Sequence, residues 1–124
     1  MTTPRTVLVV DDDPMLRDLL TQTLTAIGHE SVSAVDGFDA LEQLKKRTFD
    51  VVISDIKMPN MDGLQLLKEI REAHSSMPVL FISGFATSEM IQTAQPDGFL
   101  TKPFRIHQVE EMIEKVTSPN RHRF

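Results

Sequence analysis

The sequence lacks cysteine, any long apolar run and any broad basic region, and each absence excludes a class of protein. Without cysteine, the chain has neither a disulfide framework nor a thiolate metal site. No apolar run approaches the roughly 20 residues that span a bilayer, so we expect no membrane contact and a cytoplasmic location. The net charge of −5 argues against direct nucleic-acid binding, which normally requires a basic face.

The composition that remains is typical of one folded domain. A chain of 124 residues can bury a single core, and its 40% apolar and 25% charged residues argue against disorder. We expect an N-terminal extension over residues 1–4, a folded domain over residues 5–117 and a C-terminal tail over residues 118–124.

Strand-like and helix-like patterns alternate five times along this domain. Apolar runs predict buried strands at residues 5–10, 51–54, 78–82 and 99–101, and a less apolar run predicts an edge strand at residues 30–35. The first helix is predicted to begin after the cap residue Asp13 and to end at Gly28, whereas Pro96 limits the fourth to about two turns. This alternation predicts a parallel sheet with helices on both faces, whose ligands bind beyond the carboxyl ends of the strands.

Five residues suited to phosphoryl chemistry stand at those carboxyl ends. They are Asp11 and Asp12 after the first predicted strand, Asp55 after the third, Ser83 after the fourth and Lys102 after the fifth. Two carboxylates roughly 4 Å apart repel each other by about 4 kcal/mol at an effective dielectric near 20. A divalent cation removes that repulsion, and ligands that are all oxygen favour Mg²⁺.

The other groups at this edge suit the same chemistry. An aspartate beside the cation can act as a nucleophile and form an aspartyl phosphate. Lys102 would neutralise phosphoryl oxygens as a point charge. The Ser83 hydroxyl and the Gly84 backbone N–H could donate hydrogen bonds to those oxygens. The pattern therefore predicts a metal-assisted phosphoryl site.

Four segments also carry a resemblance to a known family. They are Val9-Val10-Asp11-Asp12, Ser54-Asp55-Ile56-Lys57-Met58-Pro59-Asn60-Met61-Asp62-Gly63, the run Pro78-Val79-Leu80-Phe81-Ile82-Ser83-Gly84, and Lys102-Pro103-Phe104. In this order and spacing, over residues 5–117, the chain resembles the response-regulator receiver domains of bacterial two-component signalling. The resemblance implies an α/β fold, a flavodoxin-like (βα)5 doubly wound parallel sheet with strand order 2-1-3-4-5 in a single domain.

The resemblance implies a phosphoacceptor and a metal site at matching positions. Asp55 is the implied phosphoacceptor. Asp11 and Asp12 match the acid pair that holds Mg²⁺, or Mn²⁺ in its place, together with Asp55 and the backbone carbonyl of Lys57. The remaining aspartate of the first cluster, Asp13, is left out of the metal site because it reads as a helix cap.

Further positions match the phosphate-binding and switching residues of the family. Ser83 and Gly84 match the phosphate-binding pair, with the Ser83 hydroxyl reporting phosphorylation, and Lys102 matches the phosphate-binding lysine. Phe99 matches the aromatic residue whose rotamer follows that hydroxyl. The resemblance also implies a cis peptide bond between Lys102 and Pro103.

The implied function is that of a phosphorylation-driven switch. The phosphoryl group comes from a histidine kinase or a histidine phosphotransfer protein, and the switched face binds a downstream protein or an output domain. The chain is then a stand-alone regulator, or the receiver of a longer regulator or of a hybrid kinase. We expect no enzymatic activity beyond self-directed phosphotransfer and autodephosphorylation.

Some features depart from the family pattern or belong to surface chemistry. The stretch from Ser83 to Lys102 is a few residues short, which leaves the geometry of the output face open. Lys57 and Phe85 flank the phosphoryl route, and we hypothesise that they slow hydrolysis. The four histidines stand apart from one another, and we expect them on the solvated surface: His29, His74, His107 and His122.

Two other function classes share parts of this pattern. A haloacid-dehalogenase-type Mg²⁺-dependent phosphatase also uses a strand-end aspartate, and Asp11-x-Asp13 fits its nucleophile motif. Met15 then stands where that motif has threonine or valine, and no late acid pair occurs near Asp97. A flavodoxin needs a loop rich in serine, threonine and glycine after the first strand, where this chain has three aspartates.

Overall fold

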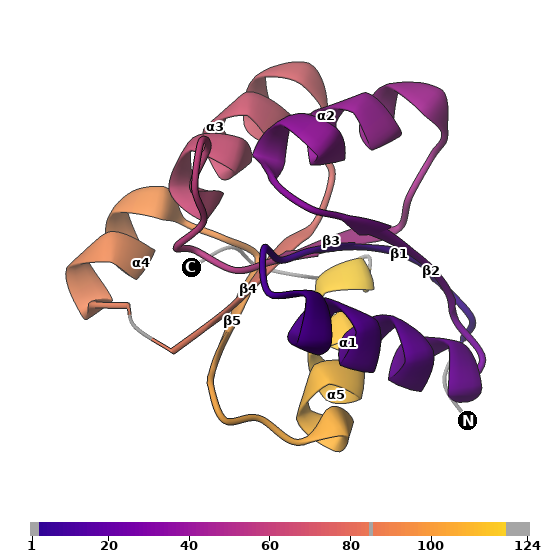
Figure 1. Ribbon diagram of the computed structural model, residues 1–124. Helices are drawn as coiled ribbons and strands as arrows, with labels where there is room; N and C mark the ends of the chain where they lie inside the picture. The colour runs from indigo at the N-terminus through magenta and orange to yellow at the C-terminus, as the bar shows by residue number, and fades with distance from the viewer. Residues whose placement is uncertain (1–2, 85, 119–124) are drawn as a thin grey trace.

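Strands and helices alternate through the whole of the computed structural model, which describes residues 3–84 and 86–118 (Figure 1). Within these residues, the elements in chain order are β1 Thr6–Val10, α1 Pro14–Ala26, β2 Glu30–Ala34, α2 Gly37–Lys46, β3 Val51–Ser54, α3 Gly63–Ala73, β4 Val79–Ser83, α4 Ser88–Ala94, β5 Gly98–Thr101 and α5 Ile106–Thr117. The predicted alternation of five strands and five helices is therefore confirmed.

The strands form one parallel sheet in the order β2-β1-β3-β4-β5, as predicted, with β2 at an edge. Helices α1 and α5 cover one face, and α2, α3 and α4 cover the other (Figure 1). The chain moves outward from β1 to β2 and then crosses back to β3, so the winding direction reverses between β1 and β3. The carboxyl ends of these two central strands therefore open into the crevice where such sheets bind ligands.

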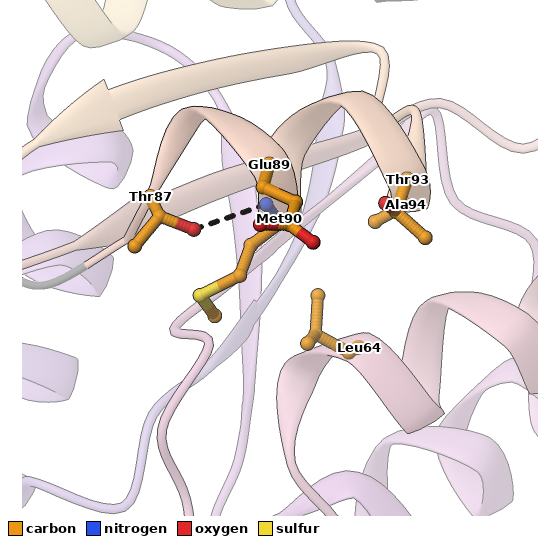
Figure 2. A pocket seen from close by; sticks show the side chains of 6 residues that line it. All are labelled: Leu64, Thr87, Glu89, Met90, Thr93 and Ala94. Carbon is orange, nitrogen blue, oxygen red and sulfur yellow. Dashed lines mark hydrogen bonds between the residues drawn. The ribbon is translucent and has the colours of Figure 1, made fainter.

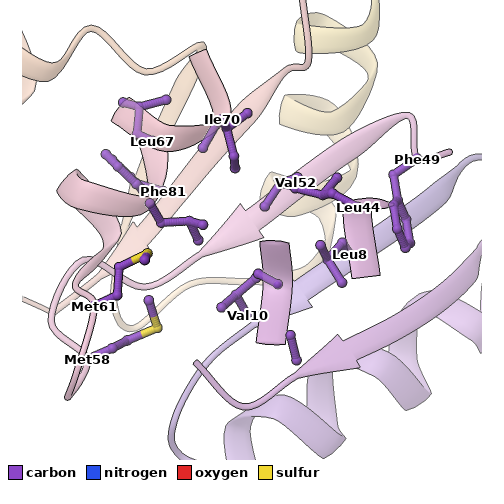
Figure 3. Packing of buried hydrophobic residues seen from close by; sticks show 14 of the residues in the cluster. Leu8, Val10, Leu44, Phe49, Val52, Met58, Met61, Leu67, Ile70 and Phe81 are labelled. Atoms are coloured by element: carbon purple, nitrogen blue, oxygen red, sulfur yellow. The ribbon is translucent and has the colours of Figure 1, made fainter. Parts of the chain in front are cut away.

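The core has two layers, because successive residues of each central strand point to opposite faces. Along β1, Leu8 and Val10 belong to the cluster beneath α2 and α3 (Figure 3), whereas Val7 and Val9 belong to the cluster against α1 and α5. All four are almost completely buried, which explains why the strand is a continuous apolar run. Each such side chain contributes roughly 1.5–3 kcal/mol through burial.

Side-chain caps set the beginnings of the two helices that lead away from the crevice. The Asp13 carboxylate accepts the Met15 backbone N–H at 3.0 Å, and Pro14 occupies the first turn, so Asp13 is the predicted cap of α1. The Asp62 carboxylate likewise accepts the Gln65 N–H at 2.8 Å at the start of α3.

Helix α4 is short, as the position of Pro96 predicts. It has seven residues, none of them fully buried, and it ends at Gln95 in the left-handed conformation with φ of 52°. By contrast, α5 has twelve residues and buries Val109, Ile113 and Val116. The shortened stretch therefore reduces α4 and leaves the fifth strand and helix intact.

The histidine prediction is wrong for His29. Its ring is buried between the start of β1 and α5: Nδ1 accepts the Arg5 backbone N–H at 2.9 Å, and Nε2 bonds to the Glu110 carboxylate. This partner is 81 residues away in the sequence, so the local pattern held no sign of it. His107 is exposed as predicted, and His122 lies outside the described residues.

Among the described residues, no helix combines the length and the apolar character that crossing a membrane requires.

Candidate functional site

Three of the predicted carboxylates meet at the carboxyl ends of β1 and β3. Asp11 and Asp12 follow β1 and Asp55 follows β3, and the Asp55 backbone N–H donates to the Val10 carbonyl at 3.1 Å. One carboxylate oxygen from each of the three lies within 4.8 Å of the others. Asp11 is buried, Asp55 half-buried and Asp12 exposed, so the cluster opens to solvent on the Asp12 side.

Lys102 reaches the same cluster from the end of β5. Its Nζ donates to Asp55 Oδ2 at 2.8 Å and lies 3.7 Å from Asp11 Oδ2. Its backbone N–H donates to the Ser83 carbonyl at 2.9 Å, which joins the ends of β4 and β5. The Lys102–Pro103 peptide bond is cis, as the resemblance implies.

Hydrogen bonds hold both oxygens of the Asp55 carboxylate. The Ile56 backbone N–H donates to Oδ1 at 2.7 Å, and Lys102 donates to Oδ2. With two donors from different elements, the carboxylate has a defined orientation at the mouth of the crevice. An oriented carboxylate is what nucleophilic attack at a bound phosphorus atom requires.

Ser83 and Phe99 lie on one face of the sheet, on neighbouring strands. Phe81 pairs with Phe99 and Ser83 pairs with Thr101, and residues opposite each other in a parallel pair point to the same face. Ser83 is buried at the end of β4, while Phe99 is half-buried and packs against the cluster beneath α2, α3 and α4. The two residues are therefore placed along one line from the strand end towards α4.

The other predicted site residues are less constrained. Gly84 is exposed, and a Cβ built on it would meet Lys102 Cβ at 3.9 Å, which is an ordinary contact. Lys57 is exposed in the loop after Asp55, while Phe85 lies outside the described residues. The hypothesis that Lys57 and Phe85 slow hydrolysis therefore stays a prediction.

Two residues matter at this edge in ways that the sequence reasoning missed. A Cβ on Gly63 would lie 2.3 Å from the Asp55 carbonyl oxygen, so only glycine allows α3 to begin this close to the strand end. Arg17 of α1 donates from Nη1 to the Asp11 carbonyl at 2.7 Å. The sequence around Arg17 gives no sign of this contact.

The electrostatics of the cluster are unbalanced. Burial raises the pKa of Asp11 above its ordinary 3.8; the Asp13 N–H and Lys102 oppose this rise, and the charges of Asp55 and Asp12 add to it. Burial alone would lower the pKa of Lys102. The hydrogen bond to Asp55 and the charges of Asp11 and Asp55 outweigh burial and raise this pKa above 10.5.

The donor set fits a hard divalent cation. All three ligand candidates are carboxylates, their oxygens are close enough to share one ion, and one ammonium alone does not neutralise them. Oxygen ligands of this kind suit Mg²⁺ and similar ions rather than zinc or copper. Asp11, Asp12 and Asp55 can therefore hold a metal ion.

A separate cleft of about 530 Å³ lies between α3 and α4 (Figure 2). Its lining residues are Leu64, Thr87, Glu89, Met90, Thr93 and Ala94. Thr87 caps α4 at this point by accepting the Met90 N–H at 3.1 Å. The cleft contains none of the predicted site residues, so the candidate site for phosphoryl chemistry lies at the carboxyl ends of the strands and not in this cleft.

Comparison with known proteins assigns the chain to a family. A family model described as the response regulator receiver domain matches residues 7–114. The DNA-binding transcriptional regulator NtrC of Escherichia coli K12 is 36% identical over 115 residues, which are 90% of this chain and 24% of that protein. The sensor histidine kinase RcsC of Salmonella typhi is 37% identical over 110 residues, which are 86% of this chain and 12% of that protein. The chain thus spans a quarter or less of the length of these relatives.

Solved structures show the same fold. The chemotaxis protein CheY4 of Vibrio cholerae superposes with a TM-score of 0.86 at 31% identity, covering 92% of this chain and 99% of that chain. The response regulator TrrA of Thermotoga maritima, solved in complex with Mg²⁺ and BeF, has a TM-score of 0.82 at 31% identity over 90% of this chain and 98% of that one.

The sequence match extends over nearly all of the sheet and its helices, and the strand order and the acidic strand-end cluster agree with it. The chain belongs to the response regulator receiver domain family of two-component signalling.

Proposed function

We propose that this receiver accepts its phosphoryl group on the Asp55 carboxylate, with Mg²⁺ held by Asp11, Asp12, Asp55 and the backbone carbonyl of Lys57. The observation that carries the proposal is the oriented Asp55 carboxylate, bonded to Ile56 N–H and Lys102 beside two further carboxylates. When bound, Mg²⁺ would supply positive charge that offsets the repulsion among the carboxylates and the incoming phosphoryl group. Mn²⁺ is the expected substitute.

The transfer step uses groups that the site already holds. An Asp55 oxygen attacks the phosphorus of a phosphohistidine, the P–N bond breaks, and its electron pair leaves with the imidazole nitrogen of the donor. The product is an acyl phosphate on Asp55. Lys102 neutralises the phosphoryl oxygens, and the Ser83 hydroxyl and Gly84 N–H donate to them.

The proposed output is a change along the face that holds Ser83 and Phe99. The Ser83 hydroxyl moves towards the phosphoryl group, and the Phe99 ring follows it into the space that this movement leaves. Their common face and neighbouring strands support this coupling. Phosphorylation would thereby shift a two-state equilibrium in the region of α4, β5 and α5.

The partners follow from the same chemistry. The phosphoryl donor is a histidine kinase or a histidine phosphotransfer protein in the cytoplasm. The switched face then binds a downstream protein or an attached output domain. The receiver spans residues 5–117, between an extension at residues 1–4 and a tail at residues 118–124. Apart from its own phosphotransfer and autodephosphorylation, we propose no enzymatic activity.

The phosphatase alternative is not favoured. Its motif would need Asp11 and Asp13 to act together at the strand end. The Asp13 carboxylate instead caps α1 through the Met15 N–H, and Asp13 is outside the carboxylate group that could hold a metal.

The test is intact mass measurement after incubation with Mg²⁺ and acetyl phosphate. The wild-type protein should gain one phosphoryl group, and Asp55→Asn should gain none while keeping its melting temperature. Lys102→Ala should gain the group slowly. An equal adduct on Asp55→Asn would contradict the assignment of Asp55, and steady turnover of a small phosphomonoester would support the phosphatase instead.

A further inference from the structure

The turn between β1 and α1 leaves one backbone carbonyl without a local donor. The Asp13 N–H donates to the Asp11 carboxylate at 2.9 Å, and the Met15 N–H donates to the Asp13 carboxylate at 3.0 Å. Pro14 has no N–H at all. The N–H groups of residues 13–15 are therefore absent or already used, and the Asp11 carbonyl takes its donor from elsewhere.

Arg17 supplies that donor from the second turn of α1. Its Nη1 donates to the Asp11 carbonyl oxygen at 2.7 Å, and the side chain is half-buried. Within the described ranges, its guanidinium forms no ion pair with a carboxylate. The contact is a charge-assisted hydrogen bond, which is shorter and stronger than a neutral one.

The bonded carbonyl belongs to the peptide that joins Asp11 to Asp12. The backbone N–H of Asp13 donates to the Asp11 carboxylate and orients it, whereas the exposed Asp12 carboxylate has no hydrogen bond among the residues that the structure describes. This peptide carries the Asp12 N atom, so its plane helps to set the backbone from which the Asp12 side chain projects. Arg17 holds that plane through its carbonyl.

We propose that Arg17 is a positioning residue for the cation site: by holding the Asp11–Asp12 peptide, it keeps both carboxylates turned towards Asp55. The inference rests on the proposed function of the three carboxylates as the Mg²⁺ site. Partners one step removed from a metal commonly change its affinity 10- to 100-fold when they are replaced.

Two effects of Arg17 oppose each other, and they make the inference testable. Its positive charge alone would repel a cation, so removal of the charge would tighten Mg²⁺ binding. Its hold on the peptide would favour binding, so loss of the bond would weaken it. Lysine keeps the charge but is a flexible point donor that lacks the planar fork of arginine. The proposal predicts that positioning dominates.

The experiment measures Mg²⁺ affinity by calorimetric titration of the wild type, Arg17→Lys, Arg17→Met and the control Lys46→Met. Lys46 is an exposed cation at the end of α2, and its replacement removes the same charge. We expect Arg17→Met and Arg17→Lys to weaken binding about tenfold and Lys46→Met to leave it unchanged. The melting temperature of each metal-free variant is measured alongside.

Several outcomes would overturn the inference. Tighter binding by Arg17→Met would mean that charge repulsion dominates. An affinity for Mg²⁺ equal to that of the wild type in both Arg17 variants, with or without a lower melting temperature, would reduce Arg17 to a structural contact. If Arg17→Met does not fold, the Mg²⁺ affinity of Arg17→Lys alone tests the inference. A wild type that binds no Mg²⁺ and takes no phosphoryl group would instead contradict the proposed function itself.

A second readout separates positioning from general damage. The rate of phosphorylation by acetyl phosphate is followed at increasing Mg²⁺ concentration. A positioning role predicts that Arg17→Met needs about tenfold more Mg²⁺ for half its maximal rate and regains most of the wild-type maximum. A reduced maximum with an unchanged Mg²⁺ requirement would contradict it.

Discussion

The two ends of the parallel sheet both hold buried charges, but they hold them in different ways. At the amino ends of the strands, which we call the amino edge, the Asp97 carboxylate is completely buried and accepts hydrogen bonds from Arg71 at 2.9 Å and from the Val79 N–H at 2.8 Å. Arg71 also donates to the carbonyls of Met77 and Gln95. Arg71 and Asp97 thus each have an opposite charge and further hydrogen bonds.

The same edge pairs His29 with Glu110 and with the Arg5 backbone N–H. These contacts join the start of β1, the turn before β2 and the middle of α5. The Arg71 network joins the end of α3 to the segment before β5. Both networks connect elements that are distant in the sequence, so they stabilise the arrangement of the helices around the sheet.

The opposite end, which we call the carboxyl edge, has a surplus of negative charge. Asp11, Asp12 and Asp55 gather there around one ammonium, that of Lys102. Burial and neighbouring carboxylates raise the pKa of Asp11, so its ionised form is held at a cost to the fold. Paired charges therefore support the fold at the amino edge, whereas a surplus of one charge marks the candidate functional site at the carboxyl edge.

The largest expected effect comes from breaking the amino edge at Arg71. Arg71→Leu should lower the free energy of unfolding by about 3 kcal/mol, because it leaves the Asp97 carboxylate buried without its counter-ion. The measurement is urea unfolding. Lys68→Leu, at an exposed position on the same helix, is the matched control and should change stability by less than about 0.5 kcal/mol. Equal effects of the two variants would contradict this account of the amino edge.

A smaller loss should follow from His29→Leu. This change leaves the Arg5 N–H without its acceptor and removes the bond to Glu110, so we expect a loss of about 2 kcal/mol. Thermal unfolding is the measurement, with the exposed His107→Leu on α5 as the control. If His29→Leu unfolds at the wild-type temperature, the His29 contacts do not stabilise the protein.

Removal of a charge at the carboxyl edge should raise the free energy of unfolding instead of lowering it. Asp11→Asn should raise the free energy of unfolding of the Mg²⁺-free protein by about 1 kcal/mol at neutral pH, because it removes one of the three repelling charges. It should also weaken Mg²⁺ binding. Urea unfolding of both proteins across pH is the measurement, and destabilisation by Asp11→Asn at neutral pH would show that the edge is not strained by charge.

The pH dependence of this gain has a definite direction. The pKa of Asp11 is raised in the folded protein, so the folded state binds this proton more tightly than the unfolded chain does. The penalty from ionised Asp11 is fully present above the raised pKa and disappears as the pH falls through it towards 3.8. The advantage of Asp11→Asn should therefore shrink over the same range, and a constant advantage would contradict the assigned cause.

The smallest expected effect is that of salt on the difference in stability between the wild type and Asp11→Asn. Raising the salt concentration from about 0.05 to about 0.5 M should stabilise the Mg²⁺-free wild type by a few tenths of a kcal/mol more than Asp11→Asn, because ions screen the repulsion. A monovalent salt that is excluded from the metal site is used, and urea midpoints are compared. An equal response of both proteins would show that the repulsion is too deeply buried to be screened.

Local patterns were enough to predict most of the fold. The strand at residues 51–54 has the predicted bounds, because its apolar run stands between Asp50 and Asp55. The short α4 was predicted because Pro96 cannot continue a helix, and the cap of α1 because Asp13 precedes Pro14. These features depend on neighbouring residues, so a linear sequence contains the information.

The contacts that were missed all depend on how separate elements pack together. His29 was predicted to be solvated, and 81 residues separate it from Glu110. The Arg71 pair with Asp97 spans 26 residues, and the close approach of Gly63 to the Asp55 carbonyl depends on how α3 docks. No periodicity or local motif marks such pairs, because they form only after the helices pack on the sheet.

By itself the sequence determined the alternation of elements, the parallel sheet and the residues at the strand ends, because apolar periodicity and helix caps act over a few residues. Only the tertiary structure decided how closely Asp11, Asp12, Asp55 and Lys102 approach one another, and which charges are paired. Distances between separate strand ends depend on sheet register and helix packing, and the strength and burial of every charge interaction depend on those distances.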